Sequence, residues 1–326
     1  MKTPRKSSRI LIGNIILVIS FAVIIDMACQ PPVKAPIMIR VGYLPMVSSL
    51  AYFVAAENQY FIDELIDIQA MPIRNSNSIA SELIGGNIEA AIELSIVPLL
   101  QRLAAGQEPK FLIYSSSNIT ADNGFDSVIV LKASPLHDMG DLSGKRVGVF
   151  QGTTAISTFK SVFKQQYPNL PEPQFIQLDS ALQMMALMNN EIDALHAYEP
   201  TLSIGIIERN CRKICTSIYA SQYSPNPIGV GAVNAKWYRE HKKEAKAFLR
   251  AMDRAVRFIR DCPEDSRRIL SKYTGSPERI TEKMNIMPMS LSTEIELADL
   301  NKYITILYNI KEIQEKRAAE SIVIQD

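Results

Sequence analysis

The feature that most constrains the fold is an internal repeat, because the order of strand, polar loop and helix occurs twice along the chain. The first copy begins at Ile39–Leu44 and the second at Lys145–Phe150, so that positions 40 and 146 are 146 − 40 = 106 residues apart. Later in each copy a turn leads through an acid and an alanine into an apolar strand, at Glu89-Ala90 and Asp193-Ala194, where the offset is 194 − 90 = 104. Such a repeat predicts two α/β lobes. Open α/β sheets bind ligands beyond the carboxyl ends of their strands, so we expect a cleft that takes up a small molecule.

Size and charge exclude some functions. The 326 residues suffice for two domains, each with its own apolar core. Thirty-five Lys and Arg residues balance 34 Asp and Glu residues, so the chain lacks the basic field that nucleic-acid binding requires. We therefore expect no nucleic-acid partner.

The first 29 residues have the layout of a secretory leader. Basic residues precede an apolar run at Ile10–Ile25, and Ala28 stands just before Cys29. The run is short for a permanent membrane anchor. Cys29 also fits a bacterial lipoprotein cleavage box, in which the cysteine is acylated, although Asp26 departs from that box. A plain signal with an incidental cysteine is the alternative, and residues 30–37 form a proline-rich tether in either case.

The other three cysteines leave two interpretations open. Cys211 and Cys215 are close enough in sequence to bridge at a turn in an oxidising compartment. Alternatively they and Cys262 are small buried apolar residues. None of the three histidines has ligand spacing to a cysteine, so we expect no metal site and no cofactor.

The two lobes are expected to share the chain unequally. Residues 38–134 and 226–326 are assigned to lobe 1 and residues 135–225 to lobe 2, with the first crossing at Lys132–Pro135 and the return before the strand Ile228–Val233. The stripe Met184, Met185 and Met188 is interpreted as core. The basic amphipathic helix Lys242–Arg260 is interpreted as a solvated surface, with a membrane surface as the alternative.

Several short motifs occur in an order and spacing that resemble the substrate-binding proteins of ABC importers, in the branch that serves nitrate, sulfonates, taurine and thiamine-precursor pyrimidines. They span about residues 38 to 260. The motifs are Val41–Pro45, Leu50–Phe61, the two acid-Ala units, Leu142–Val149, Tyr198-Glu199-Pro200 and Glu244–Ala251.

The resemblance implies a bilobal periplasmic-binding-protein fold of type II, with two doubly wound α/β lobes joined by a double-crossover hinge that closes around one solute. It also implies a monomer outside the cytoplasm, on the periplasmic or cell-surface side of the membrane. A lipid on Cys29 would hold it there, and an ABC permease with its ATPase would receive the solute.

Candidate ligand-binding residues come mainly from polar loops that feed helix N-termini, where free N–H groups and the helix dipole favour polar or anionic groups. Plain helix capping would use the same hydroxyls. The four residues are Ser48, Ser49, Thr153 and Thr154.

Further candidates follow predicted strands at the rim of the cleft. Ser95, Ser117 and Asn118 are expected there for topological reasons. Tyr198 and Glu199 match the family's aromatic-acid-Pro position, where Glu199 either pairs with an amino group of the solute or caps a helix. These loops lack the Arg that a sulfonate or nitrate clamp would use, so a neutral, zwitterionic or amine-bearing solute suits them as well.

Two other functional classes stay open. One branch of the same superfamily makes the thiamine pyrimidine with an active-site histidine and a cysteine-rich segment, but this chain lacks such a cluster. His196 lies within a predicted strand and is interpreted as a core residue. We therefore expect no catalytic residues, although a signalling or envelope role for the lobe pair is not separated from import by sequence.

Overall fold

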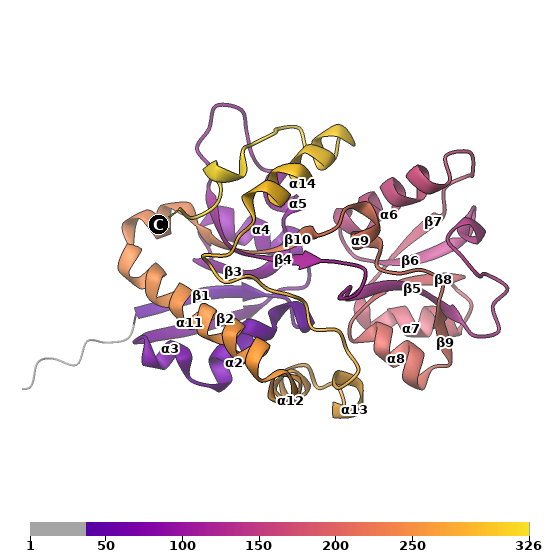
Figure 1. Cartoon of the computed structure of the whole chain (residues 1–326), viewed down its shortest axis with the longest axis horizontal. Coiled ribbons are helices and arrows are strands. Elements are labelled where there is room, and N and C mark those ends of the chain that lie inside the picture. The colour runs from indigo at the N-terminus through magenta and orange to yellow at the C-terminus, as the bar shows by residue number, and fades with distance from the viewer. Residues whose placement is uncertain (1–36, 326) are drawn as a thin grey trace, which may run out of the picture. The chain divides into compact units, whose positions relative to one another are not determined.

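The structure is a computed structural model that describes residues 37–325, in which two five-stranded sheets form two lobes (Figure 1). Sheet A, in lobe 1, has the order β2-β1-β3-β10-β4, and sheet B, in lobe 2, has the order β7-β6-β8-β5-β9. The predicted leader, the tether up to Pro36 and Cys29 lie outside the described residues. In the part of the chain that the structure describes, no helix is both long and apolar enough to cross a membrane.

Lobe 1 is built from both ends of the described chain. Its sheet contains β1 (Ile37–Tyr43), β2 (Ile66–Pro72), β3 (Ala90–Ser95), β4 (Phe111–Ile119) and β10 (Asn226–Asn234). Its first helices are η1 (Val47–Ser49), α2 (Leu50–Glu57), α3 (Tyr60–Asp63), α4 (Ser76–Gly85) and α5 (Val97–Leu100). Its later helices are α10 (Ala235–Glu240), α11 (Lys242–Asp261), α12 (Pro263–Thr274), α13 (Glu278–Thr281), α14 (Leu297–Asn309) and η3 (Ala319–Ser321).

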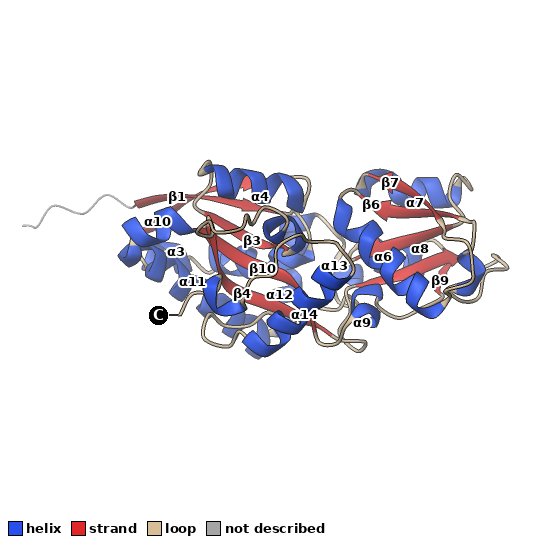
Figure 2. Cartoon of the chain, turned by 90° about the horizontal axis from the view of Figure 1, so that it is seen from above, coloured by secondary structure: helices blue, strands red, loops and turns tan. Residues whose placement is uncertain are grey.

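Lobe 2 is one continuous segment. Its strands are β5 (Asp126–Leu131), β6 (Arg146–Phe150), β7 (Gln174–Leu178), β8 (Ala194–Tyr198) and β9 (Cys211–Lys213). Its helices are η2 (Gly140–Leu142), α6 (Thr153–Gln166), α7 (Ser180–Met188), α8 (Thr201–Glu208) and α9 (Ile218–Gln222). Helices cover both faces of each sheet, with α6 and α9 on one face of sheet B and α7 and α8 on the other (Figures 1 and 2).

The repeat seen in the sequence is a repeat of topology. In each lobe the first strand of the unit pairs in parallel with the second and third, as β1 does with β2 and β3 and as β6 does with β7 and β8. Each sheet then receives a strand of opposite direction, β10 beside β3 and β5 beside β8. The predicted pair of α/β lobes is therefore present, and its sheets are mixed.

The first crossing between the lobes lies earlier than predicted. Strand β4 ends at Ile119 in sheet A and β5 starts at Asp126 in sheet B, so residues 120–125 make the crossing and not Lys132–Pro135. The apolar strand Asp126–Leu131 suits the core of either sheet, and its pairing with β8 and β9 places it in lobe 2. The chain returns to sheet A at Asn226.

Three other sequence interpretations can be compared with the structure. The prediction of a methionine core on α7 holds for Met184, which packs against the core of lobe 2, and is wrong for Met185 and Met188, which are 54% and 47% exposed. The three cysteines of the described chain are free thiols, so Cys211 and Cys215 form no bridge. Helix α11 lies against α2 and α3 and directs Arg250 and Arg254 to the carboxylates of Glu64 and Asp63.

Candidate functional site in the interlobe cleft

A cavity of about 90 Å³ lies between the lobes and takes lining residues from both. Lobe 1 contributes the loop after β1, the start of α4, the end of β3 and the middle of β10. Lobe 2 contributes the loop after β6, the first turn of α6, the end of β8 and α9. The lining is mainly apolar and aromatic, and its residues are Leu44, Met46, Ser48, Ser76, Asn77, Glu93, Ser95, Pro98, Phe125, Phe150, Gln151, Gly152, Thr153, Thr154, Ala155, Tyr198, Tyr219, Ile228, Gly229 and Met287.

The two lobes meet across this cavity through a pair of hydroxyls. Ser95 Oγ at the end of β3 and Thr154 Oγ1 in the first turn of α6 are 3.2 Å apart and share a hydrogen bond. Both residues were predicted from their positions at a strand end and a helix start. The two lobes are therefore in hydrogen-bond contact at the wall of the cavity.

Ser49 precedes α2 without capping it through its hydroxyl. The residue that precedes α6 is Gly152, which has no side chain to cap with and has a φ of 130°, which favours glycine. The buried Ser48 and Ser49 hydroxyls make no hydrogen bond within the described chain, and Ser48 lines the cavity while Ser49 does not. Thr153 also lines it.

Ser117 and Asn118, which the sequence predicts at the rim of the cleft, point to opposite faces of the sheet. Both lie inside β4 and not in a loop, and neighbouring residues of a strand point to opposite faces. Ser117 is buried and donates to Glu93, behind the cavity lining. Asn118 faces a separate hollow beside Arg260 and Asn285, so its prediction as a cleft residue is wrong.

Glu199 is held by the helix that follows it, α8. Its Oε2 accepts the backbone N–H of Ser203 at 3.0 Å and its Oε1 accepts the Ser203 hydroxyl at 2.9 Å, across the start of α8. Burial raises the pKa of Glu199 to about 6. The residue lines an outer space of about 500 Å³ next to the cavity, with Arg74 and Asp179, and does not line the inner cavity.

Aromatic rings form one wall of the inner cavity. Phe125 stacks on both Tyr198 and Tyr219, with ring centroids 5.5 Å and 5.8 Å away, and Phe150 meets Tyr198 edge-on. The two tyrosine hydroxyls are hydrogen-bonded at 2.8 Å. Burial raises the pKa of both tyrosines, so both stay neutral at ordinary pH.

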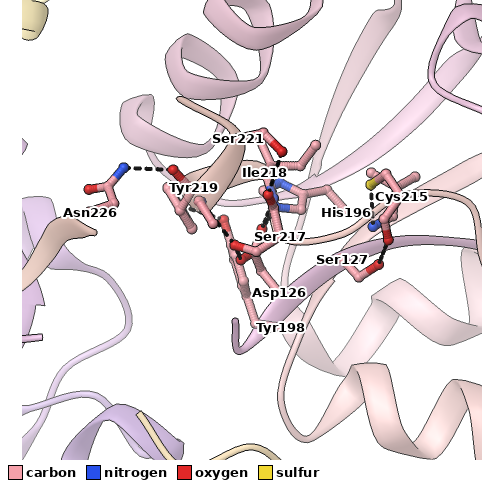
Figure 3. Close-up of polar contacts among 12 residues, drawn as sticks. Asp126, Ser127, His196, Tyr198, Cys215, Ser217, Ile218, Tyr219, Ser221 and Asn226 are labelled. Carbon is pink, nitrogen blue, oxygen red and sulfur yellow. Dashed lines mark hydrogen bonds and ion pairs between the residues drawn. The ribbon is translucent and has the colours of Figure 1, made fainter. Parts of the chain in front are cut away.

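A buried carboxylate holds this wall at the hinge (Figure 3). Asp126, the first residue of β5, accepts the Ile218 backbone N–H at 2.8 Å and the Ser217 hydroxyl, both at the start of α9. It also makes a hydrogen bond with Nε2 of His196 on β8 at 2.8 Å. Asp126 thus joins the segment after the first crossing to the segment before the second.

The most notable residue that sequence reasoning missed is Glu93 in β3. The residue is 4% exposed and lines the cavity, and Ser115 and Ser117 of β4 donate to its carboxylate at 2.8 Å and 2.6 Å. Strand β10 lies between β3 and β4, and its Gly229 has no side chain in the way: a Cβ there would lie 2.9 Å from Glu93 Oε2. A lone acid within the apolar run Ala90–Leu94 was the available signal.

The fold is the periplasmic-binding-protein fold, as predicted. The chain belongs to the NMT1/THI5 like family, which matches residues 47–266. The similar solved structures include the alkanesulfonate-binding protein SsuA from Xanthomonas axonopodis pv. citri bound to MOPS, with a TM-score of 0.72, 14% identity and coverage of 89% of this chain and 99% of that one. The nitrate-binding protein NrtA from Synechocystis PCC 6803 has a TM-score of 0.65 at 13% identity, covering 89% and 85%.

The match to one curated relative covers a shorter part of this chain. The relative is a Bacillus subtilis (strain 168) protein whose name describes an aliphatic sulfonates-binding protein. Its sequence is 23% identical to this chain over 187 residues. The match covers 57% of this chain and 54% of the relative, so the chain spans about half the length of that protein. At these identities the solved structures establish the fold.

Proposed function

We propose that this chain is an extracytoplasmic solute-binding protein that captures a small organic molecule between its lobes and delivers it to an ABC importer. The observation that carries the proposal is the cavity of about 90 Å³ lined from both lobes, in a chain of this family. A solute there would contact both lobes at once and would therefore stabilise the closed arrangement over an open one.

The lining favours binding over catalysis. Ser48, Ser95, Thr153 and Thr154 offer hydroxyls at the ends of strands and the starts of helices, and Tyr198 offers an aromatic wall. Among the described residues that line the cavity none is a histidine or a cysteine. His196 is fully buried behind Tyr198 and bound to Asp126. The names of the relatives also describe binding proteins for sulfonates and nitrate.

The solute role is tested by blocking the cleft. Thr153→Trp puts a large ring at an exposed position of the cavity wall, and we expect it to weaken solute binding at least about tenfold, because the ring occupies the solute's space. Gln165→Trp, exposed on the same helix, is the matched control and should bind as the unmodified protein does. Calorimetry with sulfonates, amines and pyrimidines measures both; equal binding by the two variants would place the solute elsewhere.

Delivery and anchoring need separate tests. The proposal includes a lipid on Cys29, a monomeric receptor, and a permease and ATPase that accept the solute. Cys29→Ala should release the protein from the membrane fraction and abolish labelling by a fatty-acid probe. Deleting the chain should abolish uptake of the bound solute by the producing cell, whereas unchanged uptake together with a lost transcriptional response would indicate a sensor.

A further inference from the structure

We propose that the cavity selects a small organic cation, a protonated or quaternary amine on a compact apolar body, and that Glu93 is its counter-ion. This inference rests on the proposed solute-binding function and specifies its ligand. It differs in charge from the sulfonates and nitrate that the names of the similar proteins mention.

The first argument is charge balance. An ionised carboxylate buried away from water is costly unless a cation pairs with it. Glu93 is 4% exposed, and its partners among the described residues are the neutral hydroxyls of Ser115 and Ser117. No lysine, arginine or histidine is among the described residues that line the cavity. A positive group in the cavity would supply the missing partner.

The second argument is that the fold makes special room for this carboxylate. Strand β10 lies between β3 and β4, so a side chain of β3 has to pass across one whole strand to meet β4. Glu93 reaches across β10 to the two serines because position 229 is glycine. The backbone of Glu93 itself has a φ of 36°, which is uncommon for a residue with a long side chain and is typical of functional sites.

The third argument concerns the rest of the lining. The rings of Phe125, Phe150, Tyr198 and Tyr219 attract cations through their electron-rich faces and repel anions there. Apolar side chains such as Leu44, Met46, Ile228 and Met287 suit a hydrocarbon body. Arg74 is the basic residue beside the outer space and lies on an exposed segment, so an anion would be drawn to the entrance and not to the inner cavity.

The test compares matched probes and matched variants of the whole protein. Choline is paired with its uncharged isostere 3,3-dimethylbutan-1-ol, and benzylamine with benzyl alcohol, with ethanesulfonate and nitrate as anions. We expect at least one cation to bind about tenfold or more tightly than its isostere. Glu93→Gln should weaken that binding at least about 30-fold, as the loss of one member of a buried charge pair does. Arg74→Gln should leave it unchanged.

Folding of the variants is controlled separately. Glu93→Gln without solute should melt at the same or a higher temperature than the unmodified protein, because it removes a carboxyl group whose ionised form is unfavourable in this buried site. Gly229→Ala keeps the charge but brings a methyl group to within contact of Glu93 Oε2, and should also weaken cation binding.

Other results overturn the inference. Equal binding of a cation and its isostere, or anion binding that Arg74→Gln weakens and Glu93→Gln does not, refutes a cation site and leaves the solute-binding function in place. If no probe of either charge binds, and no small molecule co-purifies with the protein, the inference and the proposed function fail together.

Discussion

At the scale of single residues, the two buried acids of the cleft show how environment assigns a role. Glu199 stands in the motif that resembles the family, yet both its oxygens are engaged by Ser203 at the start of α8. Glu93 belongs to no motif, yet it lines the cavity. Burial raises the pKa of both carboxyl groups. A residue's type and motif therefore do not say whether its charge is used by the protein or offered to a ligand.

Glu199 makes stability depend on pH. Its pKa rises from 4.5 to about 6 on folding, so its contribution is fully present below about pH 4.5 and is lost as the pH rises through about 6. We expect Glu199→Gln, which still accepts from Ser203, to gain about 2 kcal/mol relative to the unmodified protein between pH 4.5 and pH 7. Urea unfolding at the two pH values measures this difference. If the difference in unfolding free energy between the two proteins is the same at both pH values, Glu199 is not buried in solution.

At the scale of elements, the repeat is held in each lobe by the same ion pair. Arg40 on β1 bonds the Glu89 carboxylate and the Gly86 carbonyl, and Arg146 on β6 bonds the Asp193 carboxylate and the Asn190 carbonyl. Each acid also accepts the backbone N–H of its arginine. The pair therefore fixes the first strand of a unit against the turn that enters the third strand, which explains why the acid-Ala step recurs.

The pair in lobe 2 offers a test of this element. The Arg146 guanidinium lowers the pKa of Asp193, so its stabilisation is present at neutral pH and disappears as the pH falls through the lowered pKa. Because the pair is partly exposed, we expect Asp193→Asn to lower the free energy of unfolding by about 1 kcal/mol at pH 7 and to leave it almost unchanged in strong acid. Glu172→Gln, from the exposed pair with Lys160, is the control and should cost less than about 0.5 kcal/mol. An equal loss in both variants would contradict a special role for the repeated pair.

At the scale of the whole described unit, the two crossings are joined at one buried point. Asp126 follows the first crossing, and Ser217 and Ile218 begin the helix that precedes the second. Asn226, where the chain re-enters sheet A, donates to the Tyr219 carbonyl at 2.8 Å (Figure 3). Motion of the lobes would therefore bend the chain beside this network, and the network would carry the Tyr198 and Tyr219 wall with lobe 2.

Breaking this network should strongly lower the stability of the folded protein. Asp126→Ala leaves the Ser217 hydroxyl, the Ile218 N–H and the His196 imidazole without their partner. We expect it to lower the free energy of unfolding by about 3–5 kcal/mol. Ser221→Ala removes one hydroxyl that donates to the Ser217 carbonyl and should cost about 1 kcal/mol or less. Urea unfolding of both variants decides the point. A loss below about 1 kcal/mol for Asp126→Ala would mean that the crossings are held by other contacts.

Local pattern by itself determined the elements and their repetition. Apolar periodicity and the Gly and Asn stops predicted strands and helices that the structure contains, including the long helix α11, because these signals act within a few residues. Four polar residues predicted from strand ends and helix starts, Ser48, Ser95, Thr153 and Thr154, lie at the cavity, since the topology of open α/β sheets brings these ends together.

Only the tertiary structure decided which sheet takes β5, which face of β4 is directed to Glu93, and what Glu93 contacts. An apolar strand fits the core of either lobe, so its partner strands and not its composition assign it. Glu93 meets Ser115 and Ser117 across a strand that lies more than 100 residues later in the chain, and Gly229 permits that contact. Long-range pairing leaves no periodic trace in a single sequence, which is why the charge of the cleft became visible only in the folded protein.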